Sequence, residues 1–258
     1  MNHLTVEDRG RPAEVRSPPR GRRPRVAFQA VEQELHDFSY IVSHDLAASF
    51  RHASEFSRLL LGDLDHDLTA RQHAYAEHIQ RANANCQAMI EQLLVYSRAQ
   101  QKPLKLALEG ATPTMQFALL KLVSAMEASC AEVSIEPLGD ACADRMLIGQ
   151  AFQHLLDNAI KFRRAGVRPQ VSVTPAHSEA AWRVRVRDNG IGVDPDHRER
   201  AFRMFQRLNG EAAYPGVGAG LAISRRIARR HGGDVAFLDC DPPGACVELW
   251  LPQRRVIH

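Results

Sequence analysis

The sequence contains no run of about 18 consecutive apolar residues, the length that a membrane-spanning helix needs, so we expect no membrane span. The N-terminus has no apolar signal core, which argues against secretion. The five cysteines include no Cys-x-x-Cys pair, which argues against a zinc site or a disulfide scaffold and favours a reducing, cytoplasmic compartment. With 258 residues, 45% of them hydrophobic and 24% charged, the chain has a globular composition and room for one large domain or two modest ones.

Positive charge is concentrated in residues 1–25, which contain seven arginines and only three acidic residues. The rest of the chain carries 26 basic and 27 acidic side chains, so we expect it to have no general affinity for nucleic acid. Four prolines and few apolar groups predict a disordered basic tail over residues 1–25. The alternative is that this tail contacts nucleic acid or anionic lipid.

Residues 26–102 show apolar positions at alternating spacings of three and four, which predicts two long helices. This spacing is regular from Tyr75 to Tyr96, while Gly62 and an acidic run interrupt it earlier. Thr69 and Gln72 have the spacing of a capping box at the start of the second helix. One helical hairpin exposes half of each apolar stripe, so we expect a homodimeric four-helix bundle. The alternative is that both stripes pack on the chain's own C-terminal domain.

Residues 104–253 alternate between strand and helix patterns. The predicted helices cover 113–128, 144–162, 197–208 and a segment that ends at 231, and the predicted strands cover 131–135, 170–174, 182–187, 235–238 and 246–251. This order predicts an α/β sandwich in which helices cover one face of a mixed sheet. The chain as a whole is therefore predicted to be α+β.

A glycine-rich run with Gly216, Gly218 and Gly220 precedes one of the predicted helices. Glycine lets backbone amides approach phosphate oxygens, and the N-terminus of a helix is the positive end of its dipole. The run therefore suits phosphate binding, but taken alone it is weak, because a mobile loop has the same composition.

Two further motifs suit the other parts of a nucleotide. Asp188 ends a predicted strand and precedes Gly190 and Gly192, so its carboxylate could accept a hydrogen bond from the amine of adenine; a tight turn would use the same residues. Asn158 and Lys161 lie three apart on one helix face. An amide oxygen can ligate Mg²⁺ and an ammonium can neutralise phosphate, although this pair alone would also suit a helix surface.

The order of these motifs, with Phe202-x-x-Phe205 between the aspartate and the glycine-rich run, resembles that of the sensor histidine kinases of two-component systems. The segment from Phe38 to Leu46 resembles their dimerisation box, especially in the phytochrome-like branch. The resemblance covers residues 28–252. It implies a dimerisation and histidine phosphotransfer hairpin followed by a catalytic ATP-binding domain of the GHKL type.

The resemblance also implies a role for each motif. It makes His44 the acceptor of the γ-phosphoryl group of ATP and Asp45 the acceptor of its proton. Asn158 would hold Mg²⁺, Lys161 would contact phosphate and Asp188 would bind adenine, while the five glycines of the two glycine motifs would shape the pocket and its lid. The phosphoryl group would then pass to an aspartate on the receiver domain of a response regulator.

Two departures from the family pattern bear on the activity. His154 replaces the first asparagine of the usual Asn-x-x-x-Asn pair, which alters the expected Mg²⁺ shell. Ala48 stands where kinases with strong phosphatase activity have a threonine or asparagine that positions water, so we expect weak phosphatase activity.

Two other functions are compatible with the same fold. The first is a hydrolytic GHKL-type ATPase, which would have a glutamate at the position of His154 to activate water. The second is a non-catalytic phosphotransfer or scaffold protein that no longer binds ATP. The sequence has no recognisable sensor, so we expect input from a separate sensory protein or from a ligand that acts on the hairpin.

Overall fold

The structure of the chain is a computed structural model that describes part of its residues. These are residues 46–64, 68–101, 103–210, 214–241 and 243–253. The chain divides into two units, 1–38 and 39–258, and all the described residues lie in the second. The predicted basic tail and the predicted phosphoacceptor pair, His44 and Asp45, lie outside the described residues.

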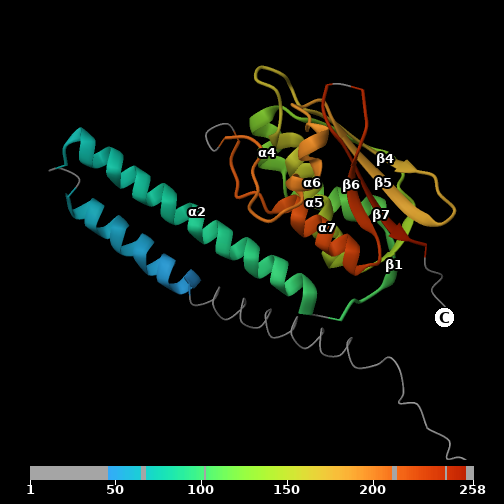
Figure 1. Ribbon diagram of the computed structural model, residues 1–258, viewed down its shortest axis with the longest axis horizontal. Coiled ribbons are helices and arrows are strands. Elements are labelled where there is room, and N and C mark those ends of the chain that lie inside the picture. Colours follow the sequence, from blue (N-terminus) through green and yellow to red (C-terminus); the bar gives the residue numbers. More distant parts are fainter. Residues whose placement is uncertain (1–45, 65–67, 102, 211–213, 242, 254–258) are drawn as a thin grey trace, which may run out of the picture. The chain divides into compact units, whose positions relative to one another are not determined.

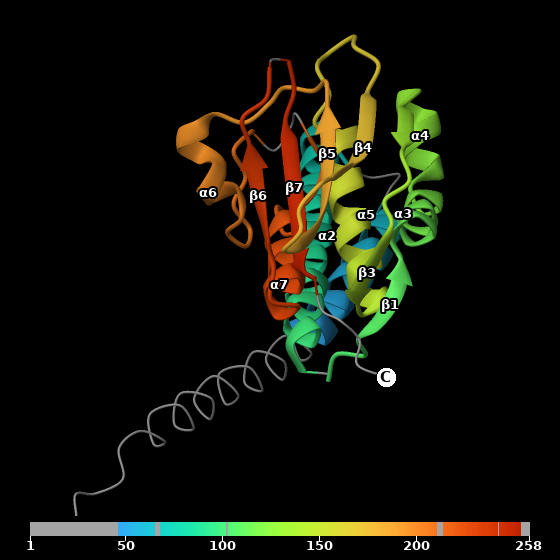
Figure 2. The same ribbon diagram turned by 90° about the vertical axis from the view of Figure 1, so that its right-hand side faces the viewer.

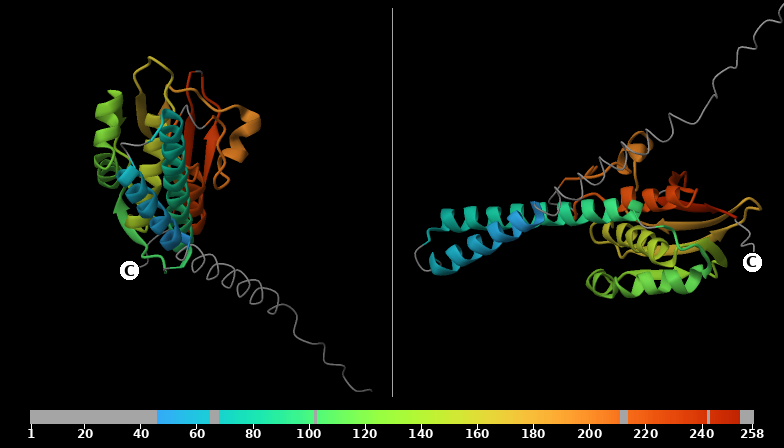
Figure 3. Two further views of the ribbon diagram at one scale, coloured as in Figure 1. Left: turned by 90° about the vertical axis from the view of Figure 1, so that its left-hand side faces the viewer. Right: turned by 90° about the horizontal axis from the view of Figure 1, so that it is seen from below.

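The N-terminal part of the described chain is a helical hairpin (Figure 1 and Figure 3). Residues 46–64 are helical, and α2 spans Ala70–Gln101. The predicted capping box precedes α2: the Thr69 amide donates to Gln72 Oε1 at 2.8 Å, and the Gln72 amide donates to Thr69 Oγ1 at 3.4 Å. The predicted hairpin and its capping box are therefore confirmed for these residues.

Much of the apolar surface of the hairpin is exposed in the single chain. Gln87 Nε2 donates to the backbone oxygen of Phe50 at 3.2 Å, which joins the two helices. Nevertheless Phe56 is 68% exposed, and Leu60 and Tyr75 are exposed as well. No helix in the described part of the chain is both long enough and apolar enough to cross a membrane.

A five-stranded mixed sheet follows, in the order β2-β4-β5-β7-β6 (Figure 2). Its strands are β2 (Glu132–Ile135), β4 (Gln170–Ala176), β5 (Ala181–Asp188), β6 (Asp234–Leu238) and β7 (Cys246–Pro252). The β2–β4 pair is parallel and the other pairs are antiparallel. A separate two-stranded sheet, β1 (Ala107–Gly110) with β3 (Asp140–Ala143), was not predicted. The α+β class and the mixed sheet are confirmed.

Helices cover one face of this sheet, as predicted (Figure 2). They include α3 (Ala111–Leu120), α5 (Arg145–Lys161) and α7 (Gly220–Arg230). Asp144 begins α5 by accepting hydrogen bonds from the amides of Met146 and Leu147. Phe152 of α5 and Ile223 of α7 are fully buried. This packing fixes the polar side of α5 and the N-terminus of α7 in place.

The predicted helix over 113–128 is wrong in one respect, because the chain forms two helices there. α3 ends at Leu120 and α4 (Val123–Ser129) begins three residues later. Leu122 between them is buried and has the non-helical angles φ −109° and ψ 9°. The break is made by i→i−3 hydrogen bonds: the Lys121 amide donates to the Ala118 oxygen at 3.3 Å and the Leu122 amide donates to the Leu119 oxygen at 2.9 Å, so α3 ends in a turn before α4 begins.

The predicted helix over 197–208 is also wrong for most of its length. A 3₁₀ turn, η1 (Pro195–His197), leads into α6 (Arg198–Ala201), and the regular helix stops there. Phe202 is buried, and Phe205 adopts a positive φ of 60°. The Phe205 amide donates to the Gly218 oxygen at 2.9 Å, so the segment leaves the helical path to contact the glycine-rich run.

Candidate functional site

A cavity of about 420 Å³ brings together three segments that are far apart in the sequence. The predicted site residues on its wall are Asn158, Lys161, Asp188, Gly192, Gly216, Gly218 and Gly220. They come from the last turns of α5, the loop after β5 and the run before α7. Gly190 lies beside this cavity, on the wall of its neighbour.

Asp188 is the last residue of β5, and its carboxylate is held by backbone amides. Oδ1 accepts from the Gly190 amide at 2.8 Å and from the Ala245 amide at 3.1 Å. Burial raises the pKa of Asp188, while these two hydrogen bonds oppose the rise. Within the described part of the chain both bonds end on the same oxygen, so the other oxygen can accept from a ligand in the cavity.

Two glycines are required by close backbone approach. A Cβ at Gly190 would lie 2.3 Å from the Phe162 oxygen, so only glycine lets the loop after β5 sit against the end of α5. Gly218 has a φ of +74°, and a Cβ there would lie 2.7 Å from the Gln206 oxygen. Gly190 supports the loop whose amide donates to Asp188, whereas Gly218 shapes the wall of the cavity.

One face of α5 supplies polar groups to the cavity. His154, Asn158 and Lys161 lie at helical spacings of four and three, and all three line the wall. Burial lowers the pKa of Lys161; Asp157 opposes this change and the Arg207 cation adds to it. A partly desolvated ammonium on a cavity wall favours an anionic ligand, because the ligand would supply the missing counter-charge.

His154 carries an unpaired polar atom. Its Nε2 is buried and, within the described residues, has no hydrogen-bond partner. The ring packs against the start of α7, where a Cβ on Gly220 would lie 3.3 Å from Nδ1. Burial lowers the pKa of His154, with Asp157 opposing, so a neutral imidazole is favoured. The sequence marked His154 as a departure from the family pattern and did not predict it as a site residue.

The donors on this wall fit a nucleotide-bound Mg²⁺ better than a metal held by protein alone. The described residues contain no cluster of three or more His, Cys, Asp or Glu that could hold a metal. Mg²⁺ prefers oxygen ligands in an octahedral shell and often takes several of them from substrate phosphates. The Asn158 amide oxygen suits one place in such a shell, and the other places would have to come from phosphate and water.

Sequence reasoning missed two residues that line the same cavity, Arg207 and Tyr214. The Arg207 guanidinium donates to the backbone oxygen of Tyr214 at 2.7 Å. The Tyr214 ring packs on Phe162 at 5.2 Å between centroids, and its hydroxyl donates to the Arg163 oxygen at 2.8 Å. The two contacts of the Tyr214 side chain join segments about fifty positions apart, and the nearest sequence signal is a basic residue two positions after Phe205.

Known proteins resemble this chain in sequence over the three segments that supply the predicted site residues. Residues 143–255 match the family described as "Histidine kinase-, DNA gyrase B-, and HSP90-like ATPase". Phytochrome-like protein Cph1 of Synechocystis sp. is 32% identical over 210 residues, which cover 81% of this chain and 28% of that protein. Cyanobacterial phytochrome A of Nostoc sp. is 32% identical over 202 residues, which cover 78% of this chain and 26% of that protein. The chain thus spans less than a third of the length of these curated relatives.

Solved structures show the same fold at lower identity. Full-length ShkA in complex with AMPPNP has a TM-score of 0.59 and 24% identity, over 83% of this chain and 44% of that one. Histidine kinase ThkA in complex with the response regulator TrrA has a TM-score of 0.60 and 16% identity, over 89% of this chain and 66% of that one.

Proposed function

Because the chain is a homologue of sensor histidine kinases and carries an ATPase domain of their type, we propose that it phosphorylates its own His44 with ATP. The phosphoryl group would then pass to an aspartate on the receiver domain of a response regulator. ThkA, a structural neighbour, was solved in complex with such a regulator. In this proposal residues 26–102 form the phosphotransfer hairpin and residues 104–253 the catalytic domain.

The observation that carries the proposal is the shared cavity of Asp188, Lys161 and the glycine-rich run. Asp188 would accept a hydrogen bond from the exocyclic amine of adenine. Lys161 would neutralise phosphate charge, and the run before α7 would present backbone amides at the positive end of an 11-residue helix. These groups match the base and the phosphates of one nucleotide. The neighbour ShkA, solved with AMPPNP, supports this choice of ligand.

Phosphoryl transfer depends mainly on alignment and on neutralisation of charge. Asn158 would hold Mg²⁺ through its amide oxygen, and the ion, when bound, would neutralise charge on the β- and γ-phosphates. A ring nitrogen of His44 would form a bond to the γ-phosphorus while the bond to the bridging oxygen of ADP breaks. The Asp45 carboxylate would take the ring proton, since it is the neighbouring base.

The hairpin provides the second part of the proposal. Its exposed apolar residues, such as Phe56 and Tyr75, would be covered in a homodimeric four-helix bundle. Ala48 cannot orient water through its side chain, so dephosphorylation of the regulator would be slow. We propose the cytoplasm as the site of action, where the five free cysteines would stay reduced, and a separate sensory protein as the input.

Incubation of the full chain with γ-labelled ATP and Mg²⁺ tests this function. We expect label that is stable in base and labile in acid, and we expect His44→Gln to abolish it. His52→Gln is the matched control, because His52 is an exposed histidine of the helical residues 46–64. Label that persists in His44→Gln would contradict the proposal. Steady release of phosphate without labelled protein would indicate the hydrolytic ATPase instead.

A further inference from the structure

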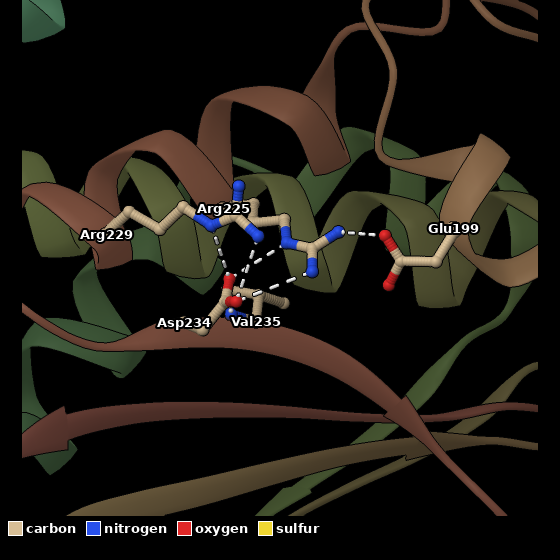
Figure 4. Close-up of polar contacts among 5 residues, drawn as sticks. All are labelled: Glu199, Arg225, Arg229, Asp234 and Val235. Carbon is tan, nitrogen blue, oxygen red and sulfur yellow. Dashed lines mark hydrogen bonds and ion pairs between the residues drawn. The ribbon is translucent and has the colours of Figure 1, made fainter.

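The guanidinium of Arg225 joins three elements, α6, α7 and β6 (Figure 4). Arg225 of α7 donates from Nη1 to Glu199 Oε2 of α6 at 2.7 Å. It also donates from Nε to Oδ1 of Asp234, the first residue of β6, at 2.9 Å and from Nη2 to Oδ2 at 3.4 Å. We refer to Glu199, Arg225 and Asp234 as the arginine clamp.

The clamp also has an aromatic side. The Arg225 guanidinium lies 4.6 Å from the centre of the Phe202 ring, within the range of a cation–π contact. Phe202 is buried and packs on Phe237 of β6 at 5.3 Å between centroids. The Arg225 side chain is only 14% exposed, whereas that of Glu199 is 77% exposed. Arg225 is therefore the less exposed residue at the centre of the clamp, and Glu199 contacts it from the exposed surface of α6.

The segment 199–207 runs from the clamp to the wall of the cavity. At its far end the Phe205 amide donates to the Gly218 oxygen at 2.9 Å, and the Gln206 oxygen lies close to the Cα of Gly218. Arg207 then donates to the Tyr214 oxygen. The segment is thus anchored by Arg225 at one end and holds the glycine-rich run at the other.

We propose that Arg225 is a positioning residue for nucleotide binding. Through Glu199 and Phe202 it would hold segment 199–207 so that the glycine-rich run is already in place when the phosphates arrive. This inference rests on the proposed function, because it assumes that the cavity binds ATP. Loss of the clamp should weaken nucleotide affinity and leave the rate of transfer at saturating ATP unchanged, because Arg225 touches none of the proposed reacting groups.

Arg229 provides a matched control on the same helix, one turn later. It donates to the same carboxylate, from Nε to Asp234 Oδ1 and from Nη2 to Oδ2, both at 3.1 Å. Within the described residues its hydrogen bonds do not extend to α6. Both arginines therefore stabilise the start of β6, but of the two it is Arg225 that also donates a hydrogen bond to Glu199, whereas Arg229 acts on Glu199 only as a nearby charge.

The test is a titration of the full chain with a fluorescent ATP analogue and Mg²⁺. We expect Arg225→Gln and Glu199→Gln to raise Kd about fivefold, the change that corresponds to roughly 1 kcal/mol. Arg229→Gln should raise it less than about twofold. Because Glu199 is exposed, Glu199→Gln should keep the thermal unfolding midpoint of the wild-type chain, which separates positioning from stability. Arg225→Lys should recover only part of the affinity, since an ammonium lacks the planar fork of a guanidinium.

Two results would overturn this inference alone. The first is that the wild-type chain binds the analogue and that Glu199→Gln binds it with the same Kd. The other is an equal loss of affinity in Arg225→Gln and Arg229→Gln, which would assign the effect to Asp234 and the start of β6. A wild-type chain that does not bind the analogue would overturn the proposed function, and this inference with it.

Discussion

In the cavity, burial raises the pKa of Asp188 and lowers the pKa of Lys161, so both groups are shifted toward their neutral forms. In the arginine clamp the shifts have the opposite sign. The hydrogen bond from Arg225 lowers the pKa of Glu199, and although burial alone would raise the pKa of Asp234, hydrogen bonds from Arg229 and Arg225 bring it below its usual value. Charged side chains of the cavity thus lack sufficient counter-charge, whereas those of the clamp are paired with opposite charges.

This difference separates residues that would bind the ligand from residues that stabilise the surrounding fold. A desolvated charge without a counter-charge costs folding free energy, and it is tolerated where a ligand supplies the partner. The lowered pKa values of Glu199 and Asp234 mean that their ionised carboxylates are already stabilised in the apo protein, so they have less to gain from a ligand. Substitutions of Asp188 and Lys161 in the cavity should therefore act on binding, whereas loss of the Asp234 carboxylate, which two arginines share, should act mainly on stability.

The largest expected effect is the loss of nucleotide affinity in Asp188→Asn. Asparagine keeps one oxygen for the amides of Gly190 and Ala245, but it replaces the second oxygen, which would accept from adenine, with an NH2 group that cannot accept a hydrogen bond. We expect the affinity for an ATP analogue to fall about ten- to hundredfold, the loss of one charged hydrogen bond. Fluorescence titration measures it, with the exposed Asp140→Asn as control. An unchanged Kd in Asp188→Asn would remove adenine binding from this residue.

A smaller loss of affinity is expected for Lys161→Met. The ammonium would contact phosphate, so the affinity for the triphosphate should fall about tenfold while that for adenosine stays the same. Calorimetric titration with both ligands checks the difference, and Lys121→Met, at an exposed lysine after α3, is the control. Equal losses for the two ligands would show that Lys161 does not face phosphate.

At Asp234, which lies in the clamp and is bonded by two arginines, the main expected effect is on stability. Asp234→Asn removes the charge that two arginines share, so the free energy of unfolding should fall by about 1 kcal/mol. Urea unfolding of the apo chain measures this change. Asp239→Asn is the control, because Asp239 pairs with Arg198 from a fully exposed position and should cost less than about 0.5 kcal/mol. Equal costs for both variants would contradict the view that the clamp is a stabilising cluster.

The smallest effect is on the pH dependence of stability, and its sign differs between the two aspartates. The raised pKa of Asp188 means that its contribution to stability falls as pH rises above about 4, the unfolded value. The lowered pKa of Asp234 means that its contribution is present above about pH 4 and is lost as pH falls through the folded value.

Urea unfolding between about pH 3 and about pH 7 can resolve both signs. The wild-type stability minus that of Asp188→Asn should decrease with rising pH. The wild-type stability minus that of Asp234→Asn should increase over the same range. Two differences that change in the same direction would contradict the comparison.

Local signals made the regular elements predictable from the sequence. The capping box at Thr69 is satisfied by backbone and side-chain hydrogen bonds between neighbours. The helix predicted over 144–162 is found as α5, and the hydrogen bonds that Asp144 accepts at its start likewise join residues within a few positions. The glycine-rich run and Asp188 could be placed in one cavity because their order resembled that of a known family.

Features set by distant contacts were not predictable in this way. The prediction of a helix over 197–208 was wrong because Phe205 leaves the helical path to reach Gly218, and no local pattern encodes that contact. The arginine clamp is similar: Glu199 and Arg225 are 26 positions apart, and a basic residue on an amphipathic helix is more often solvated. Such side chains acquire a role only when the sheet brings α6, α7 and β6 together.

The central claim is that the cavity is built to bind a nucleotide and the clamp is built to hold the cavity. Thermal unfolding of the wild-type chain, Asp188→Asn and Asp234→Asn, each with and without excess ATP analogue and Mg²⁺, tests it most directly. The claim predicts that Asp188→Asn unfolds no earlier than the wild-type chain but loses the nucleotide-induced rise in midpoint, whereas Asp234→Asn unfolds earlier and keeps most of that rise. An Asp188→Asn variant that unfolds early and is still stabilised by nucleotide would contradict it.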